Sequence, residues 1–131
     1  MKTIPLLALT LLASPALAAE PAAKRPLDVR ANASDETTTK FADALRDALP
    51  ASERMRAPTG EDEDDLSLVI ANVTPDKKKF GWSIDLLKVN ANFTPSRVGS
   101  FTGKCRADEL AKCARNVIAD ADRAVRKAEK D

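Results

Sequence analysis

Several residue types that many enzymes depend on are absent or scarce in this chain. Among its 131 residues there is no histidine and no tyrosine, and there are only one tryptophan, four phenylalanines and two cysteines. Without histidine, the Ser-His-Asp and Cys-His nucleophiles, histidine general bases and histidine-containing zinc or copper sites are excluded. So few aromatic side chains also make a stacking platform for bases or sugars hard to build. We therefore expect a non-catalytic protein that needs no cofactor and no metal.

Long apolar runs are also scarce, and the most prominent one lies at the N-terminus. Residues 1–18 begin with Lys2, continue through an apolar stretch at 4–12 and end in the small-residue pattern of 16–18. This is the layout of a secretory signal peptide cleaved near residue 18. No later stretch approaches the ~18 apolar residues of a membrane helix, so we expect no stable membrane insertion. The mature chain is expected to begin with a flexible segment, 19–26, and to be periplasmic or secreted.

Neither sign of charge is in excess. The chain has 21 basic and 20 acidic residues, and loss of Lys2 with the signal peptide would leave 20 of each. Nucleic acids and anionic membranes both attract strongly cationic surfaces, which a neutral chain does not offer overall. We therefore expect the partner to be another protein of the bacterial cell envelope rather than nucleic acid.

The spacing of apolar residues predicts the secondary structure. Strands are expected where apolar and polar residues alternate, and helices where apolar residues recur every three or four positions. The resulting order is a strand at 27–31, a helix at 35–49, an uncertain strand at 53–57, strands at 65–73, 80–93 and 97–105, and a helix at 107–130. This order predicts a single α+β domain over 27–131, with two helices packed on one face of a mainly antiparallel sheet of about four strands.

Both cysteines lie in one short stretch, GKCRADELAKC, which holds Cys105 and Cys113. Within one helix, eight residues would separate their Cα atoms by about 12 Å, too far for a disulfide. With Cys105 at a strand end and Cys113 in the following helix, the sulfurs can meet. Thioredoxin-like redox chemistry uses C-x-x-C spacing, and a metal site would need Asp108 and Glu109 as further ligands. We therefore predict one structural disulfide, as is common in exported proteins.

Two runs of like charge are the first candidates for contact with a partner. The candidate residues are Glu61, Asp62, Glu63, Asp64 and Asp65 in an acidic loop, and Lys77, Lys78 and Lys79 at a hairpin tip. The acidic run lacks the alternating D-x-[DN]-x-[DN]-G pattern of a calcium loop. The simplest interpretation of the acidic run is a solvated loop, and that of the lysine run is a hairpin tip whose charges discourage pairing of strand edges. The functional interpretation of both runs is that they dock a charged partner.

A carboxylate-based hydrolase is a third hypothesis, for which Asp85, Glu61 and Asp64 would be the residues to test. Such chemistry needs two carboxylates at a defined separation in a cleft. Alternation in the strand at 80–93 instead predicts that Asp85 lies on the exposed face. The same alternation places Trp82 on the core face, so we do not expect it to be a ligand platform.

The stretch TKFADALRDALPASERMRA, residues 39–57, carries a weak resemblance. Phe41, Leu45, Leu49 and Ser52 match a pattern that is similar in style to the start of small periplasmic α/β accessory domains, such as the N-terminal domain of TolB. This resemblance covers less than a fifth of the chain and implies no functional residue. The lack of a catalytic set, of a cofactor motif and of a lipid-anchor cysteine, together with the neutral charge, predicts an exported, non-catalytic binding or accessory protein of the cell envelope. A proteinaceous inhibitor of a secreted or periplasmic hydrolase is the alternative of the same size class.

Overall fold

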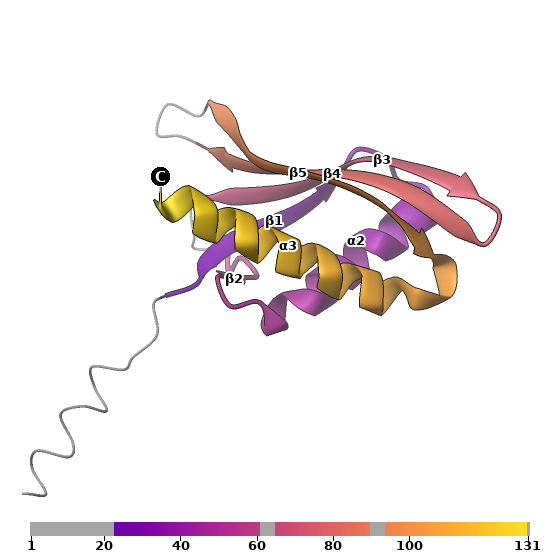
Figure 1. Ribbon diagram of the computed structural model, residues 1–131, viewed down its shortest axis with the longest axis horizontal. Helices are drawn as coiled ribbons and strands as arrows, with labels where there is room; N and C mark the ends of the chain where they lie inside the picture. The colour runs from indigo at the N-terminus through magenta and orange to yellow at the C-terminus, as the bar shows by residue number, and fades with distance from the viewer. Residues whose placement is uncertain (1–22, 61–64, 90–93, 131) are drawn as a thin grey trace, which may run out of the picture.

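The computed structural model describes residues 23–60, 65–89 and 94–130, which form one sheet with two helices on the same face (Figure 1). The elements in chain order are β1 (Arg25–Ala31), α2 (Glu36–Ala48), the 3-10 turn η1 (Leu49–Ala51), β2 (Met55–Arg56), β3 (Leu66–Asp76), β4 (Lys79–Val89), β5 (Pro95–Arg106), the 3-10 turn η2 (Ala107–Glu109) and α3 (Leu110–Lys130). The predicted α+β architecture is confirmed.

The sheet has five strands in the order β2-β1-β3-β4-β5, one more than the sequence predicted. The additional strand is β2, only two residues long, at the position where the sequence pattern left a strand uncertain. Strands β3, β4 and β5 form an antiparallel meander, whereas β1 pairs in parallel with both β2 and β3. Parallel neighbours require a crossover, and α2 provides the one between β1 and β2.

Helix α2 matches the predicted helix to within one residue at each end. The Asp35 carboxylate caps it by accepting hydrogen bonds from the backbone N–H of Thr38 at 3.1 Å and from its hydroxyl at 2.7 Å. Phe41 and Leu45 are fully buried, and burial of a large apolar side chain of this kind contributes roughly 1.5–3 kcal/mol. Pro50 lies in η1, directly after the helix, where its ring nitrogen has no N–H to continue the helical hydrogen bonds.

Alternation along the strands directs one face of the sheet toward the helices. In β4 the buried residues are Phe80, Ile84 and Leu86, and Asp85 lies between them on the opposite face, as predicted. Within the described residues β4 ends at Val89, and residues 90–93 of the predicted strand lie outside them.

Strand β1 begins two residues earlier than the sequence pattern indicated. Its backbone pairs with β2 from Arg25 onward, so Arg25 and Pro26 belong to the sheet rather than to the expected N-terminal segment 19–26. The predicted signal peptide, 1–18, and residues 19–22 lie outside the described residues.

Helix α3 packs along β5 and runs back toward the start of that strand. The close approach is at Gly99, where an added Cβ would lie 3.2 Å from the Cβ of Ala124. Both α2 and α3 follow strands of the same direction and fold back over them, so the two helices run in the same general direction, although their ribbons cross in Figure 1. Both therefore begin at the end of the molecule that holds the β3–β4 turn and the end of β5.

Candidate binding surface at the disulfide end

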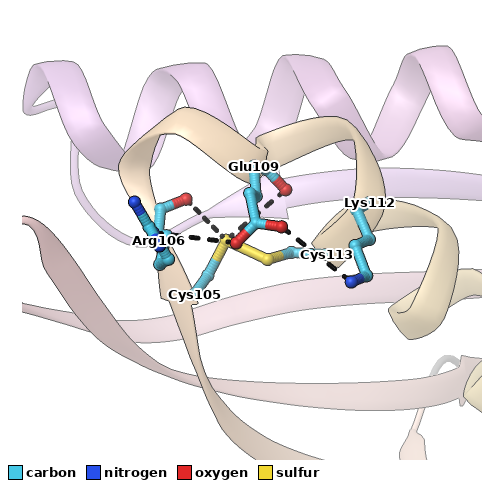
Figure 2. The surroundings of a disulfide bond; sticks show 5 residues. All are labelled: Cys105, Arg106, Glu109, Lys112 and Cys113. Carbon is cyan, nitrogen blue, oxygen red and sulfur yellow. Dashed lines mark hydrogen bonds and ion pairs between the residues drawn. A yellow bond between two sulfur atoms is a disulfide. The ribbon is translucent and has the colours of Figure 1, made fainter.

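The Cys105–Cys113 disulfide joins the end of β5 to the first turn of α3, so the predicted disulfide is confirmed. The two Cα atoms are 6.0 Å apart, within the usual range for a disulfide. The turn η2 lies between them and reverses the chain, which brings the two sulfurs together (Figure 2). Both thiols are used in this bond, so neither is free to ligate a metal ion.

The surroundings of the disulfide are charged. Figure 2 shows the Glu109 carboxylate between Arg106 and Lys112, over the sulfur atoms. Its oxygens lie 3.7 Å from Arg106 Nε and 3.9 Å from Lys112 Nζ. The Arg106 guanidinium also pairs with Asp108 at 3.2 Å. These pairs are solvent-exposed, so each contributes at most about 1 kcal/mol to stability.

The β3–β4 turn lies beside this corner and is fastened to it. Lys77 and Lys78 form the turn, and Lys77 has a positive φ of 59°, which is uncommon for a residue other than glycine. The backbone N–H of Ala107 donates to the carbonyl oxygen of Lys78 at 2.9 Å. Pairing of Lys79 with Arg106 continues the connection across β4 and β5. The lysine run predicted as a hairpin tip is therefore held against the disulfide corner.

These elements enclose a shallow cleft of about 250 Å³ beside the disulfide. Its lining residues are Lys79, Lys104, Cys105, Arg106, Glu109, Lys112, Cys113 and Asn116. We define the lysine end as Lys77, Lys78, Lys79 and Lys104, all of which are exposed. Within 23–60, 65–89 and 94–130, none of these four lysines forms an ion pair. Their charges are thus available to an incoming anionic group.

Lys104, Arg106 and Lys112 were not singled out from the sequence. They are 25 or more residues from the lysine run at 77–79, and no motif links the two segments. The antiparallel register of β4 and β5 sets Lys104 opposite Gly81 and Arg106 opposite Lys79. The disulfide then brings Lys112 of α3 to the same place. Only the alternation of charged residues toward the end of β5 could have hinted at this cluster.

The acidic candidates do not join this surface. Glu61, Asp62, Glu63 and Asp64 lie outside the described residues. Asp65 is half-buried, and its carboxylate accepts from Arg25 Nε at 2.5 Å while its backbone carbonyl accepts from Val89 N at 3.1 Å. Asp65 therefore connects β1 to the β3–β4 pair, which is a structural role. Asp65 lies directly before β3 and Lys77 directly after it. About 35 Å of extended strand therefore separates the end of the acidic run from the lysine run.

Asp85 and Trp82 occupy the faces that the sequence predicted. The Ser100 hydroxyl donates to the Asp85 carboxylate at 2.9 Å, and Arg97 Nε lies 3.7 Å from it, on the sheet face turned away from the helices. Trp82 packs on the helix face, 5.9 Å from the ring of Phe41 and directly over Gly103. Its Nε1 is buried without a hydrogen-bond partner in the described part of the chain.

Two carboxylates at the start of α2 have altered acidities. Hydrogen bonds from the hydroxyl and backbone N–H of Thr38 hold the pKa of Asp35 below its ordinary value of 3.8. A hydrogen bond and the positive charge of Lys40 lower the pKa of Glu36. Both effects stabilise a charged helix N-terminus, where the helix dipole favours anions. They belong to helix capping rather than to acid–base chemistry.

Comparison with protein-family models and with curated proteins finds no match for this chain. Neither helix in the described ranges has the length and apolar content needed to cross a membrane. The same residues contain no group of three or more potential cysteine or carboxylate ligands for a metal ion.

Proposed function

We propose that this protein is a non-catalytic binding or accessory protein of the bacterial cell envelope, and that it docks an acidic surface of another envelope protein on the lysine end. One observation carries the proposal. Four lysines without ion-pair partners in the described chain are clustered on a corner that a disulfide and a backbone hydrogen bond hold in place. A rigid corner loses little conformational entropy when a partner binds to it.

The distribution of charge favours an acidic protein patch over a polyanion. The chain as a whole has a net charge of only +1, so its positive potential is local to the lysine end. Nucleic-acid binding usually requires a basic face or stripe and aromatic or groove-reading side chains as well. A local patch of lysines instead suits steering and orientation of a protein partner.

Two features support an exported setting. A disulfide is stable in the periplasm or outside the cell, where thiols are not kept reduced. The pattern of residues 1–18 is that of a cleavable secretory signal. The resemblance of residues 39–57 to periplasmic accessory domains such as the N-terminal domain of TolB agrees with the same compartment.

The braced turn at Lys77 and Lys78 also favours the second candidate, a proteinaceous inhibitor of a secreted or periplasmic hydrolase. Inhibitors of this kind present a pre-organised loop to the enzyme, and here the carbonyl of Lys78 is held by Ala107 next to the disulfide. An inhibitor would form one tight complex of equal stoichiometry, whereas an accessory protein would be found in larger envelope assemblies.

The test is crosslinking and affinity capture of the tagged exported protein from its own envelope fraction, followed by mass spectrometry. The wild type would be compared with a variant in which Lys77, Lys78 and Lys79 are changed to Glu. A matched control changes three exposed lysines far from this end, Lys88, Lys127 and Lys130, to Glu.

We expect the control to capture the same proteins as the wild type and the lysine-end variant to lose them. A single hydrolase captured at equal stoichiometry would establish the inhibitor function instead. Equal capture by both variants would contradict the role of the lysine end.

A further inference from the structure

A second surface lies between the two helices, on the side away from the sheet, and it is independent of the lysine end. Two adjoining hollows of about 510 and 330 Å³ run between α2 and α3. They meet at Ala48, Ala51 and Arg115, which line both. We call this the helix groove; its lining residues on α2 include Asp43, Ala44 and Asp47, and those on α3 include Ala111, Arg115, Ala119 and Arg123.

Negative charge predominates on the α2 side of the helix groove and positive charge on the α3 side. The α2 side bears Asp43 and Asp47 and one lysine, Lys40, which pairs with Glu36. The α3 side bears Arg115, Arg123 and Arg126 and one carboxylate, that of Asp122, which is buried. Asp43 pairs with Arg46 of its own helix, and Arg123 with its helical neighbour Asp120. Asp47 and Arg115 line the same hollow, yet in the described chain neither forms an ion pair, with each other or with another residue.

This arrangement is self-complementary. Because α2 and α3 run in the same general direction, a two-fold axis along that direction lays α2 of one copy on α3 of a second copy, at the same level along the axis. Asp47 of each copy then faces Arg115 of the other, so both unpaired charges gain a partner, twice in one interface. Alanines in the floor of the groove let helices approach closely.

We infer that the occupant of the helix groove is a second copy of this chain, and that the protein forms a two-fold dimer through its helix layer. In this dimer the two helices of each copy pack against the two helices of the other, and one sheet lies on either side of the four helices. It leaves the lysine end and the outer face of each sheet free, so two copies of the partner-binding surface would be displayed by one particle. The inference does not depend on the proposed function.

The experiment is sedimentation velocity of the exported protein over a range of concentrations, with circular dichroism to verify the fold of each variant. Asp47→Arg and Arg115→Asp are made singly and together. Each single reversal should weaken the dimer and raise its dissociation constant roughly a hundredfold or more, because the repulsion occurs at both symmetric contacts. The double variant restores opposite charges and should recover the dimer.

Charge reversals elsewhere serve as matched controls. Lys127→Asp lies on α3 outside the helix groove, and Asp76→Arg lies at the end of β3; neither should alter the dissociation constant. The wild-type dimer should weaken as sodium chloride is added, because salt screens exposed ion pairs, and this measurement needs no variant.

A wild-type chain that stays monomeric at all concentrations would overturn the inference. A double variant that stays monomeric while folded, or single reversals that leave the dimer unchanged, would also overturn it.

Discussion

The carboxylate of Asp122 in α3 accepts a hydrogen bond from the hydroxyl of Ser52 at 2.6 Å, across 70 residues of chain. The same carboxylate accepts from the backbone N–H groups of Glu53 at 3.2 Å and Arg54 at 3.3 Å. The Ser52 oxygen in turn accepts from Met55 N at 2.9 Å. Asp122 and Ser52 are only 8% and 2% exposed, so this network fastens the segment before β2 to α3.

Loss of the Asp122 carboxylate should be costly because its donors would stay buried without an acceptor. We expect Asp122→Ala to lower the free energy of unfolding by about 2–4 kcal/mol, measured by urea denaturation. The matched control is Asp120→Ala on the same helix, where the carboxylate is partly exposed and pairs with Arg123; its effect should stay within about 0.5 kcal/mol. Equal losses for the two variants would show that the network contributes little.

The disulfide should stabilise the fold by restricting the unfolded chain. For so short a loop the chain-entropy relation predicts about 2.5 kcal/mol. Cys105→Ser and Cys113→Ser should therefore lower the thermal midpoint by similar amounts, and a reductant should lower that of the wild type likewise. The variant lacking both cysteines should not respond to reductant. Thiol labelling of two free cysteines in the native exported protein would contradict this prediction.

The cap of α2 should make stability depend on acid pH. Because the folded-state pKa of Asp35 is lowered below 3.8, its contribution is complete above that value and is lost as the pH falls through the lower folded pKa. The difference in unfolding free energy between the wild type and Asp35→Ala should therefore shrink on acidification. The side-chain amide of Asp35→Asn accepts hydrogen bonds at any pH. The free energy of unfolding of this variant should therefore exceed that of Asp35→Ala by the same amount at every pH. A wild-type advantage that does not change with pH would disagree with this mechanism.

The contact between Gly103 and Trp82 should not tolerate a side chain. A Cβ at position 103 would lie 2.7 Å from Cζ2 of the indole, so Gly103→Ala must displace the ring and should cost about 1–3 kcal/mol. The nearest atoms to a Cβ at Gly81 are 3.9 and 4.0 Å away, which makes Gly81→Ala a matched control on the neighbouring strand. Trp82 is the chain's one tryptophan, so its emission spectrum should shift only in the first variant. An unchanged spectrum in Gly103→Ala would show that the ring did not move.

Local pattern was sufficient for most of the fold. The four-residue spacing of Phe41 and Leu45 and the alternation around Ile84 predicted a helix and a strand, because the repeat of each element determines which side chains share a face. The disulfide was predictable because one helix would hold the two Cα atoms too far apart, whereas a strand end followed by a helix can bring Cys105 and Cys113 together. The sequence could give the strand β2 only as uncertain, because two residues are too few to show a periodic pattern. Its pairing depends on where β1 and η1 place it.

The sequence alone therefore determined the architecture, the disulfide and the charged runs as candidates, since these depend on neighbours along the chain. Tertiary structure decided which charges act together. It separated Asp65 from the lysines by the length of β3, and it paired Asp65 with Arg25. It added Lys104 to the lysine run and set Asp47 opposite Arg115, because strand register and helix packing bring together residues that no local spacing relates.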